Sequence, residues 1–311
     1  MIVKDSKIYI AGHNGMVGSA ILRKLKNEGY ENIIFKSSKE LDLRIQKNVD
    51  EFLSSEKPEY IIDAAAIVGG IWANNEYQYR FLMDNMLIQN NLINASINNK
   101  IKNFIFLGSS CIYPKLATQP MKEEYLLSGP LEETNKWYAI AKITGVKLIE
   151  SIRNEFGYNY VSLMPTNLYG PNDNFDEMTS HVIPGMIAKF HKAKIKNIKS
   201  VTLWGDGSPL REFLHVDDLA EAINLFLNNE AKDFIYNVGS DQEISIKNLA
   251  KLVSKTVRYN GEILWDKNFP NGTPKKKLDS RKIHEFGFSP KIKLEKDGLK
   301  TVYNWYINSQ I

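Results

Sequence analysis

Short runs of apolar residues recur along the chain and are separated by longer stretches with helical spacing. The runs are nearly continuous in apolar residues rather than alternating, a pattern typical of strands that are buried on both faces of a sheet. We predict strands at residues 7–11, 32–36, 59–65, 102–108, 160–164 and 234–238.

The stretches between these runs carry apolar residues at intervals of three and four, which predicts amphipathic helices. The helices are expected at residues 16–27, 75–97 and 136–156, with a shorter one around 49–53. Strands that alternate with helices indicate an α/β fold with a doubly wound parallel sheet of the Rossmann type. Residues 169–181, rich in Asn, Asp, Pro and Gly, and the charged stretch 271–280 are predicted to be loops.

The regular alternation loosens after residue 168, which indicates two parts. A nucleotide-binding Rossmann domain is expected to comprise residues 1–168 and roughly 213–238. A smaller α/β domain that shapes the substrate pocket is expected to comprise roughly residues 169–212 and 239–311.

Composition narrows the class of protein without identifying it. The 311 residues are 43% hydrophobic and 24% charged, which is ordinary for a soluble globular protein and excludes a disordered chain, collagen or a coiled coil. The net charge of +4 comes without a basic stripe, so we expect no nucleic-acid partner. No apolar stretch approaches the roughly 18 residues that span a bilayer, so no membrane partner is expected. The single cysteine suits a reducing cytoplasm, where we expect the protein, and no bound metal is expected.

The first predicted strand leads into three glycines with the spacing G-x-x-G-x-x-G, at the start of the first predicted helix. Glycines in this context let the backbone approach a pyrophosphate, which the free N–H groups of the helix N-terminus then bind. The alternative is a glycine-rich turn that binds no ligand. The expected cofactor contacts in this turn are Gly12, Asn14, Gly15, Met16, Val17 and Gly18.

The end of the second predicted strand indicates which dinucleotide is bound. An NAD site usually has an acidic residue there for the ribose 2′-hydroxyl, whereas this chain has Lys36-Ser37-Ser38-Lys39. Cations and hydroxyls suit a 2′-phosphate, so we expect NADP(H), bound in part by Lys36, Ser37 and Ser38. The alternative is that the two lysines are merely solvated.

A serine, a tyrosine and a lysine form a candidate catalytic group. Tyr138 and Lys142 are four residues apart on a predicted helix and therefore lie on one face, and Ser109 follows the fourth predicted strand. Ligands of doubly wound sheets bind at the carboxyl ends of the strands. Tyr138 can donate a proton to a ketone oxygen, Ser109 can bind the same oxygen, and the Lys142 ammonium favours the phenolate. The alternative is a surface helix pair.

These motifs resemble the extended short-chain dehydrogenase/reductases and, within them, the GDP-L-fucose synthase family, which epimerises and reduces GDP-4-keto-6-deoxymannose. The resemblance covers nearly the whole chain, and Cys111 and His181 are its specific signal. The similar segments are 12–18, 64–71, 108–114, 134–135, 138–142, 165–171, 180–184, 204–205 and 211–218.

The resemblance implies NADPH-dependent reduction at C4 and epimerisation at C3 and C5. Cys111 resembles the base and His181 the acid of the epimerisation, and a nearby cation would help the thiol to ionise. The alternatives are a small buried core cysteine and an ordinary loop histidine. The resemblance also implies cofactor contacts by Leu107, Gly108, Ser109, Tyr138, Lys142, Pro165, Asn167, Leu168 and His181.

The resemblance further implies a GDP-linked 4-keto sugar as the substrate. Arg211 matches a phosphate-contacting arginine, Trp204 a residue near the nucleotide, and Lys189 a basic residue for the pyrophosphate; a guanidinium fork suits two phosphate oxygens. Lys276 adds charge there or is merely solvated. The expected substrate contacts are Asn167, Lys189, Trp204, Arg211, Asn271 and Lys276.

Three positions depart from the family pattern. Asn14 and Ser38 stand where arginines are usual, and Asn271 stands where aspartate is usual. The alternative function is therefore a C4 reductase without epimerase activity, acting on a GDP-4-keto-heptose in surface polysaccharide synthesis. A third alternative is a non-catalytic dinucleotide-binding protein, although such a protein is expected to have lost Tyr138 or Lys142. By analogy with the family, the helices around Asn85 and Lys142 are expected to form a homodimer interface.

Overall fold

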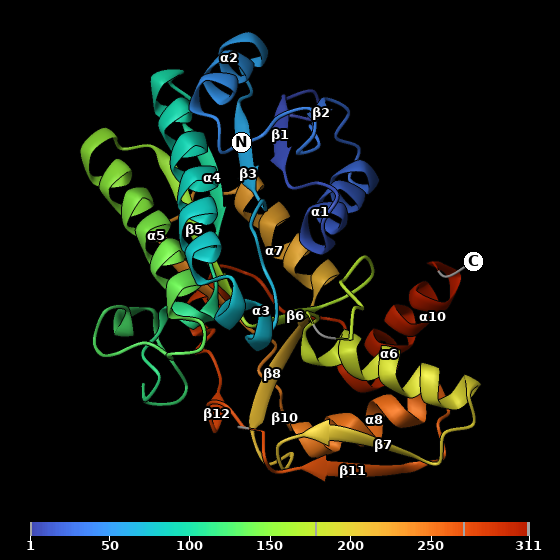
Figure 1. Ribbon diagram of the computed structural model, residues 1–311. Helices are drawn as coiled ribbons and strands as arrows, with labels where there is room; N and C mark the ends of the chain where they lie inside the picture. The colour runs from blue at the N-terminus through green and yellow to red at the C-terminus, as the bar shows by residue number, and fades with distance from the viewer. Residues whose placement is uncertain (1, 178, 270, 310–311) are drawn as a thin grey trace.

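The computed structural model describes residues 2–177, 179–269 and 271–309, and it centres on a six-stranded parallel sheet (Figure 1). This sheet confirms the predicted doubly wound Rossmann architecture. All six predicted strands are present in it, although the second is reduced to two paired residues at the edge of the sheet. In spatial order the strands are β2 (Ile33–Ile34), β1 (Ile8–Ala11), β3 (Tyr60–Asp63), β4 (Asn103–Leu107), β5 (Asn159–Pro165) and β9 (Ile235–Val238).

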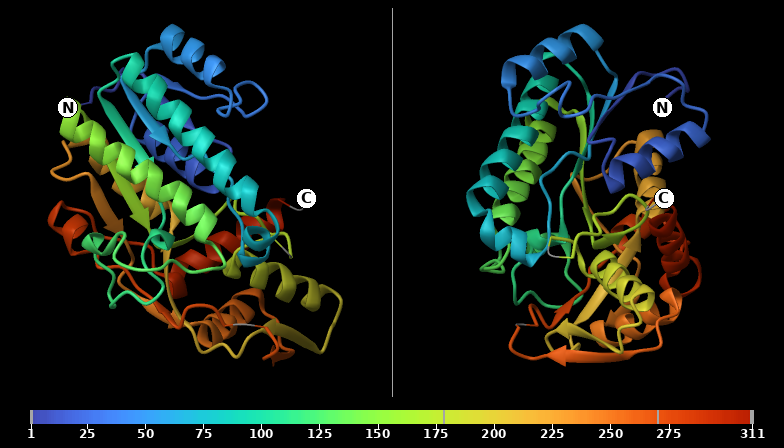
Figure 2. Two further views of the ribbon diagram at one scale, coloured as in Figure 1. Left: turned by 60° about the vertical axis from the view of Figure 1, so that its left-hand side comes forward. Right: turned by 45° about the vertical axis from the view of Figure 1, so that its right-hand side comes forward.

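Helices cover both faces of this sheet, as the two views of Figure 2 show. Their apolar stripes and the strands form two separate cores, and strand residues alternate between them: Ile8 and Ile10 belong to one core and Tyr9 to the other. One face is covered by α2 (Gln46–Glu56), α4 (Gln78–Asn98) and α5 (Lys136–Phe156), and the other by α1 (Met16–Asn27) and α7 (Val216–Asn228).

A second group of elements lies at the end of the molecule toward which the parallel strands point (Figure 1). It has its own core, in which Phe190 and Leu249 are fully buried. The strands are β6 (Asn167–Tyr169), β7 (Ser200–Trp204), β8 (Leu210–His215), β10 (Glu243–Ser245), β11 (Glu262–Asp266) and β12 (Lys275–Lys276), and the helices are α6 (Val182–Ile195), α8 (Ile246–Val257) and α10 (Leu299–Ser309). The predicted division of the chain into a nucleotide-binding and a substrate-binding domain stays a prediction.

Several short elements connect these layers. They are α3 (Ile71–Glu76), α9 (Arg281–Glu285), two 3-10 turns η1 (Ser110–Ile112) and η2 (Glu123–Tyr125), and one π-helical turn η3 (Leu294–Gly298). None of the helices described is long and apolar enough to cross a membrane.

Three predicted elements differ from the structure. The helix expected at 75–97 is two helices, α3 and α4, because Tyr77 leaves the helical conformation. Its N–H still bonds to the carbonyl of Ala73, so the apolar spacing continues across the break and does not reveal it. The short helix expected at 49–53 extends over Gln46–Glu56. The stretch 271–280 is not entirely loop, because Lys275 and Lys276 pair with β8 as strand β12.

Candidate functional site

The glycine turn joins β1 to α1, and its three glycines have different structural roles. Gly12 has a left-handed φ of +79°, and a Cβ there would lie 2.6 Å from the carbonyl oxygen of Ala64. A Cβ on Gly18 would lie 2.1 Å from the carbonyl oxygen of Gly12. These two positions exclude a side chain because the backbone packs against itself.

Gly15 is different because the fold itself leaves room for a side chain. Its φ is −77°, and a Cβ there would be 3.4 Å from its nearest neighbour, the Gly12 carbonyl oxygen. No side chain of the described residues caps α1, so the N–H groups of its first turn remain available. An open backbone and uncapped donors fit the pyrophosphate of a dinucleotide.

In the segment after β2, Ser37 is hydrogen-bonded to Glu40. The sequence analysis did not identify Glu40. The Ser37 N–H and hydroxyl donate to Glu40 Oε2 at 2.8 and 2.6 Å, which lowers the pKa of the Glu40 carboxyl. Lys36 Nζ lies 3.8 Å from Glu40 Oε1. Lys36, Ser38 and Lys39 are exposed. The two Ser37 donors are therefore bonded to a carboxylate, and the 2′-phosphate contacts predicted for Lys36, Ser37 and Ser38 stay predictions.

The Lys142 amine is held against the carboxyl end of β4. Its Nζ donates to the carbonyl oxygen of Leu107 at 2.8 Å and lies 4.6 Å from the centre of the Phe106 ring. The side chain is only 3% exposed. On the preceding residue, the Ala141 carbonyl accepts a hydrogen bond of 2.6 Å from Gln89 of α4, which helps to fix this turn of α5.

Tyr138 lies one turn before Lys142 on α5, with its ring centre 5.9 Å from Lys142 Nζ. Burial raises the pKa of the Tyr138 phenol well above its ordinary value, and negative charge on Cys111 and on Asp63 raises it further. The sequence analysis expected Lys142 to favour the phenolate, but in the protein alone burial dominates. The phenol is therefore protonated at neutral pH, as a proton donor must be.

Ser109 and Cys111 complete this group at the end of β4. Cys111 Sγ donates to Ser109 Oγ at 3.0 Å, and the Cys111 N–H donates to the same oxygen at 3.3 Å. Charge on Cys111 also acts on the pKa values of Tyr138 and Lys142, so the three side chains share one site. The structure thus brings together four of the five predicted catalytic residues.

His181 approaches from a different part of the chain. It is exposed at the N-terminus of α6, yet the surrounding protein lowers the pKa of its imidazole by desolvation. Two residues earlier, the Thr179 carbonyl accepts a hydrogen bond from the Gly70 N–H. A Cβ on Gly69 would touch both this carbonyl and Phe81, whose ring packs edge-on against Tyr138. Gly69 and Gly70 therefore lie between the Phe81 ring, which packs on Tyr138, and the segment that leads to His181.

The predicted substrate residues form two groups. Arg211 of β8 and Lys276 of β12 are paired across neighbouring strands. Burial lowers the pKa of both, and for Lys276 negative charge on Cys111 and Glu132 acts in the opposite direction. Lys276 is half-buried, and its predicted role in substrate binding stays a prediction.

The second group contains Lys189 and Trp204. Lys189 Nζ lies 5.3 Å from the Trp204 ring centre, and that ring stacks on Phe269 with 4.6 Å between centroids. Asn271 lies beside this group and accepts a hydrogen bond from the Asp206 N–H at 2.9 Å. Phe269 was not identified from the sequence, because a lone aromatic residue in a loop carries no periodic signal.

Some predicted residues also make contacts that join parts of the fold. The Asn167 amide donates to the carbonyl oxygen of Glu212 at 2.9 Å and so joins β6 to β8. Asn14 offers its backbone carbonyl to the side chain of Asn172. Leu168 packs against the core on the α1 side of the main sheet, and Pro165 is the last residue of β5. The roles predicted for these residues stay predictions.

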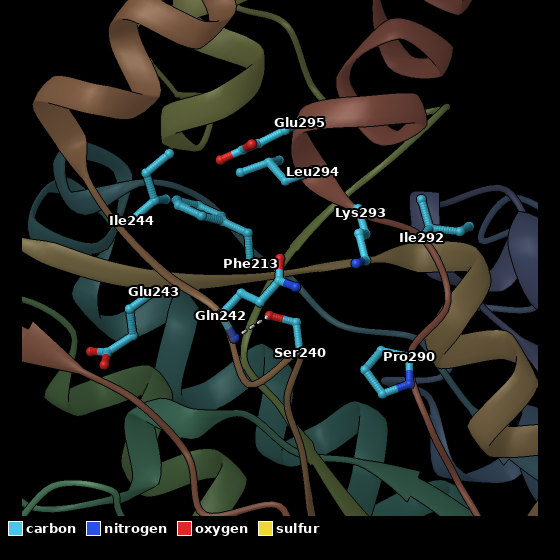
Figure 3. Close-up of a pocket in the computed structure, with 10 residues that line it drawn as sticks. All are labelled: Phe213, Ser240, Gln242, Glu243, Ile244, Pro290, Ile292, Lys293, Leu294 and Glu295. Atoms are coloured by element: carbon cyan, nitrogen blue, oxygen red, sulfur yellow. Dashed lines mark hydrogen bonds between the residues drawn. The ribbon is translucent and has the colours of Figure 1, made fainter.

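A cavity of about 70 Å³ lies elsewhere, between β8, β10 and the η3 turn (Figure 3). Ser240, Gln242 and Lys293 are among its lining residues, none of which is a predicted site residue. Ligand sites for drug-sized molecules usually exceed about 300 Å³. This cavity is therefore too small for a nucleotide sugar.

Comparison with known proteins places the chain among nucleotide-sugar enzymes. Residues 8–239 match the model of the NAD dependent epimerase/dehydratase family. The chain is 50% identical to GDP-L-fucose synthase 1 of Arabidopsis thaliana, with 98% of this chain and 94% of that protein aligned. A GDP-6-OMe-4-keto-L-xylo-heptose reductase from C. jejuni is similar in structure, with a TM-score of 0.93, 36% identity and 99% of each chain covered. A GDP-mannoheptose C4 reductase from Campylobacter jejuni, solved with NADP bound, has a TM-score of 0.90 and 37% identity over 99% of this chain and 100% of that one.

The contrast between Gly15 and Gly18 yields a prediction. Gly15→Ala should keep its folding stability and weaken NADP binding, because its methyl group fits the protein but occupies the space beside the uncapped helix. Gly18→Ala should lose about 1–3 kcal/mol of unfolding free energy through overpacking. Urea unfolding and calorimetric titration with NADP measure the two effects. Equal loss of stability in both variants would contradict this assignment.

Proposed function

The chain belongs to the NAD dependent epimerase/dehydratase family, and we propose that it is an NADP-dependent oxidoreductase that reduces the C4 ketone of a GDP-4-keto-6-deoxy sugar and epimerises C3 and C5. Family membership confirms the resemblance inferred from the sequence. The observation that carries the proposal is the convergence of Ser109, Cys111, Tyr138 and Lys142 at the carboxyl end of β4. We also propose that residues 1–168 with 213–238 hold the cofactor and that the remainder holds the GDP-sugar.

In the proposed reduction, the protein supplies and controls the proton. The glycine turn, the segment 36–38 and Lys142 would hold NADPH, which when bound supplies the hydride. Tyr138 donates its proton to the ketone oxygen, and the Lys142 ammonium stabilises the phenolate that remains. Because Ser109 Oγ accepts its hydrogen bond from Cys111, the serine's own proton is free to bind the ketone oxygen.

In the proposed epimerisation, the same ketone makes the protons at C3 and C5 acidic. Cys111 removes a proton from one face and His181 returns one from the other. Lys142 and Lys276 both interact electrostatically with Cys111, the proposed base. The desolvated His181 imidazole has a lowered pKa, which makes its protonated form a stronger acid.

We propose that cationic side chains bind the diphosphate of the substrate. Arg211 offers a forked donor and Lys276 a point charge on neighbouring strands. Lys189 and the exposed Trp204–Phe269 stack are proposed to contact the nucleotide beyond it. The second candidate function is C4 reduction of a GDP-4-keto-heptose without epimerisation, and the likeness to the two heptose reductases supports it.

Replacing Tyr138 by Phe tests the proposed proton donor. The variant should lose about 10²–10⁴-fold in kcat because the ring stays packed while the transferable proton is removed. NADPH binding should stay close to that of the wild type. Stopped assays of ketone reduction and fluorescence titration with NADPH measure the two properties, and unimpaired turnover would exclude Tyr138 as the acid.

Solvent exchange separates the two candidate functions. In deuterated water with a GDP-4-keto-6-deoxy sugar and no NADPH, the wild type should incorporate deuterium at C3 and C5, and Cys111→Ala should not. NMR of the recovered sugar measures the label. Reduction without any exchange, with a GDP-4-keto-heptose as the better substrate, would favour the second candidate.

We propose that the outer faces of α4 and α5 pair in a homodimer. Exposed apolar side chains on these helices include Tyr79, Met83 and Ile140. Sedimentation velocity should find a dimer for the wild type and a monomer for the double variant Met83→Glu, Ile140→Glu. The matched control is Leu116→Glu, which removes an exposed apolar side chain from a loop. A monomeric wild type would refute this interface.

A further inference from the structure

Asp63 is a fully buried acid at the end of β3 that the proposed reaction leaves without a role. Its Oδ1 accepts the Ala65 N–H at 3.1 Å, whereas its buried Oδ2 has no hydrogen-bond partner among the residues that the structure describes. A buried carboxylate without a full set of partners is costly in a folded protein. Such a group needs a compensating charge.

The strand register places Asp63 beside the Lys142 amine. Asp63 pairs with Phe106 of β4, and the Phe106 ring lies directly under Lys142 Nζ, 4.6 Å from its centre. The next residue, Leu107, supplies the carbonyl that accepts the Lys142 N–H. An ammonium has three N–H groups, and this is its one hydrogen bond within the described parts of the chain.

The titratable groups around this pair come from three elements. Tyr9 of β1 and Tyr138 and Lys142 of α5 interact electrostatically with Asp63. Cys111 of η1 interacts with Tyr138 and Lys142. Of these groups only Lys142 is cationic, so it is the compensating charge for the buried acid.

We propose that Asp63 is a positioning residue that acts through Lys142: its buried carboxylate keeps the Lys142 ammonium charged and held at the end of β4. The catalytic consequence of this pairing rests on the function proposed above. Asp63 has no direct role at the substrate.

The direction of the effect follows from the charges. Burial lowers the pKa of Lys142, and the Asp63 carboxylate raises it. The same carboxylate raises the pKa of Tyr138. Burial raises the pKa of Asp63 itself to about 6, so the acid is ionised above that pH. Loss of its charge should therefore make both Lys142 and Tyr138 lose their protons at lower pH.

Asp63→Asn tests this pairing, since an amide keeps the shape and removes the charge. The Lys142 signal in NMR spectra of protein labelled with 13C at lysine Cε should titrate about one pH unit lower in the variant. The alkaline limb of the kcat/KM profile for ketone reduction should move in the same direction. Asp63→Glu should restore both midpoints toward the wild type.

Asp218→Asn is the matched control, because Asp218 is a buried carboxylate that bonds only backbone N–H groups of Lys291 and Ile292 in the described structure. It should leave the Lys142 titration unchanged. An unshifted Lys142 midpoint in Asp63→Asn, or an equal loss of activity at every pH, would overturn the proposal.

A titration of the wild-type protein tests the pairing of Asp63 with Lys142 without relying on the folding of a variant. Its Lys142 signal should show a second inflection near pH 6, where Asp63 takes up a proton. A Lys142 signal without this inflection would overturn the pairing. The NMR titrations use no substrate, so they test the Asp63 assignment independently of the proposed function. If the Lys142 midpoint shifts in Asp63→Asn but the wild type reduces no GDP-4-keto sugar, the proposed function is refuted and the Asp63 assignment stands.

Discussion

The site depends on one buried amine. Lys142 crosses from α5 to the main sheet and donates to the Leu107 carbonyl at the end of β4, where it is almost completely removed from water. A charge in such a place is costly unless it is paired and hydrogen-bonded. The Leu107 carbonyl, the Phe106 ring and the Asp63 carboxylate compensate that cost together, and they bring strands β3 and β4 and helix α5 to one point.

A second constraint is the close approach of backbone to backbone at the glycine turn. Gly12 and Gly18 let the turn pack on itself and on the start of the segment after β3. That segment begins at Ala64, directly after Asp63, so the glycine turn and the buried acid are parts of one packed unit. The position of the uncapped helix α1 is thereby fixed relative to the Lys142 amine.

The second group of elements is joined to this unit through β8. Glu212 is buried in that strand and accepts N–H groups from Ser240, Asp241 and Leu278. Its carbonyl accepts the side chains of Thr166 and Asn167, which directly follow β5. The strand that carries Arg211 is therefore held to the end of the main sheet, and β12, which carries Lys276, pairs with the same strand.

The six strands of the main sheet and the helices α1, α2, α4 and α5 were predicted from the sequence alone, because apolar spacing reports directly which faces are buried. The same local reasoning identified the glycine turn and the Ser109, Tyr138 and Lys142 group, since spacing on one helix and position after one strand place them. The roles of Asp63 and Phe269 emerged only from the tertiary structure. Asp63 looks like an ordinary residue at the end of a strand until the register sets it against Phe106 and Lys142, and Phe269 looks like an isolated aromatic residue until it stacks on Trp204. Contacts between distant segments leave no periodic pattern in the sequence, so the electrostatic partners of a site appear only when the chain is folded.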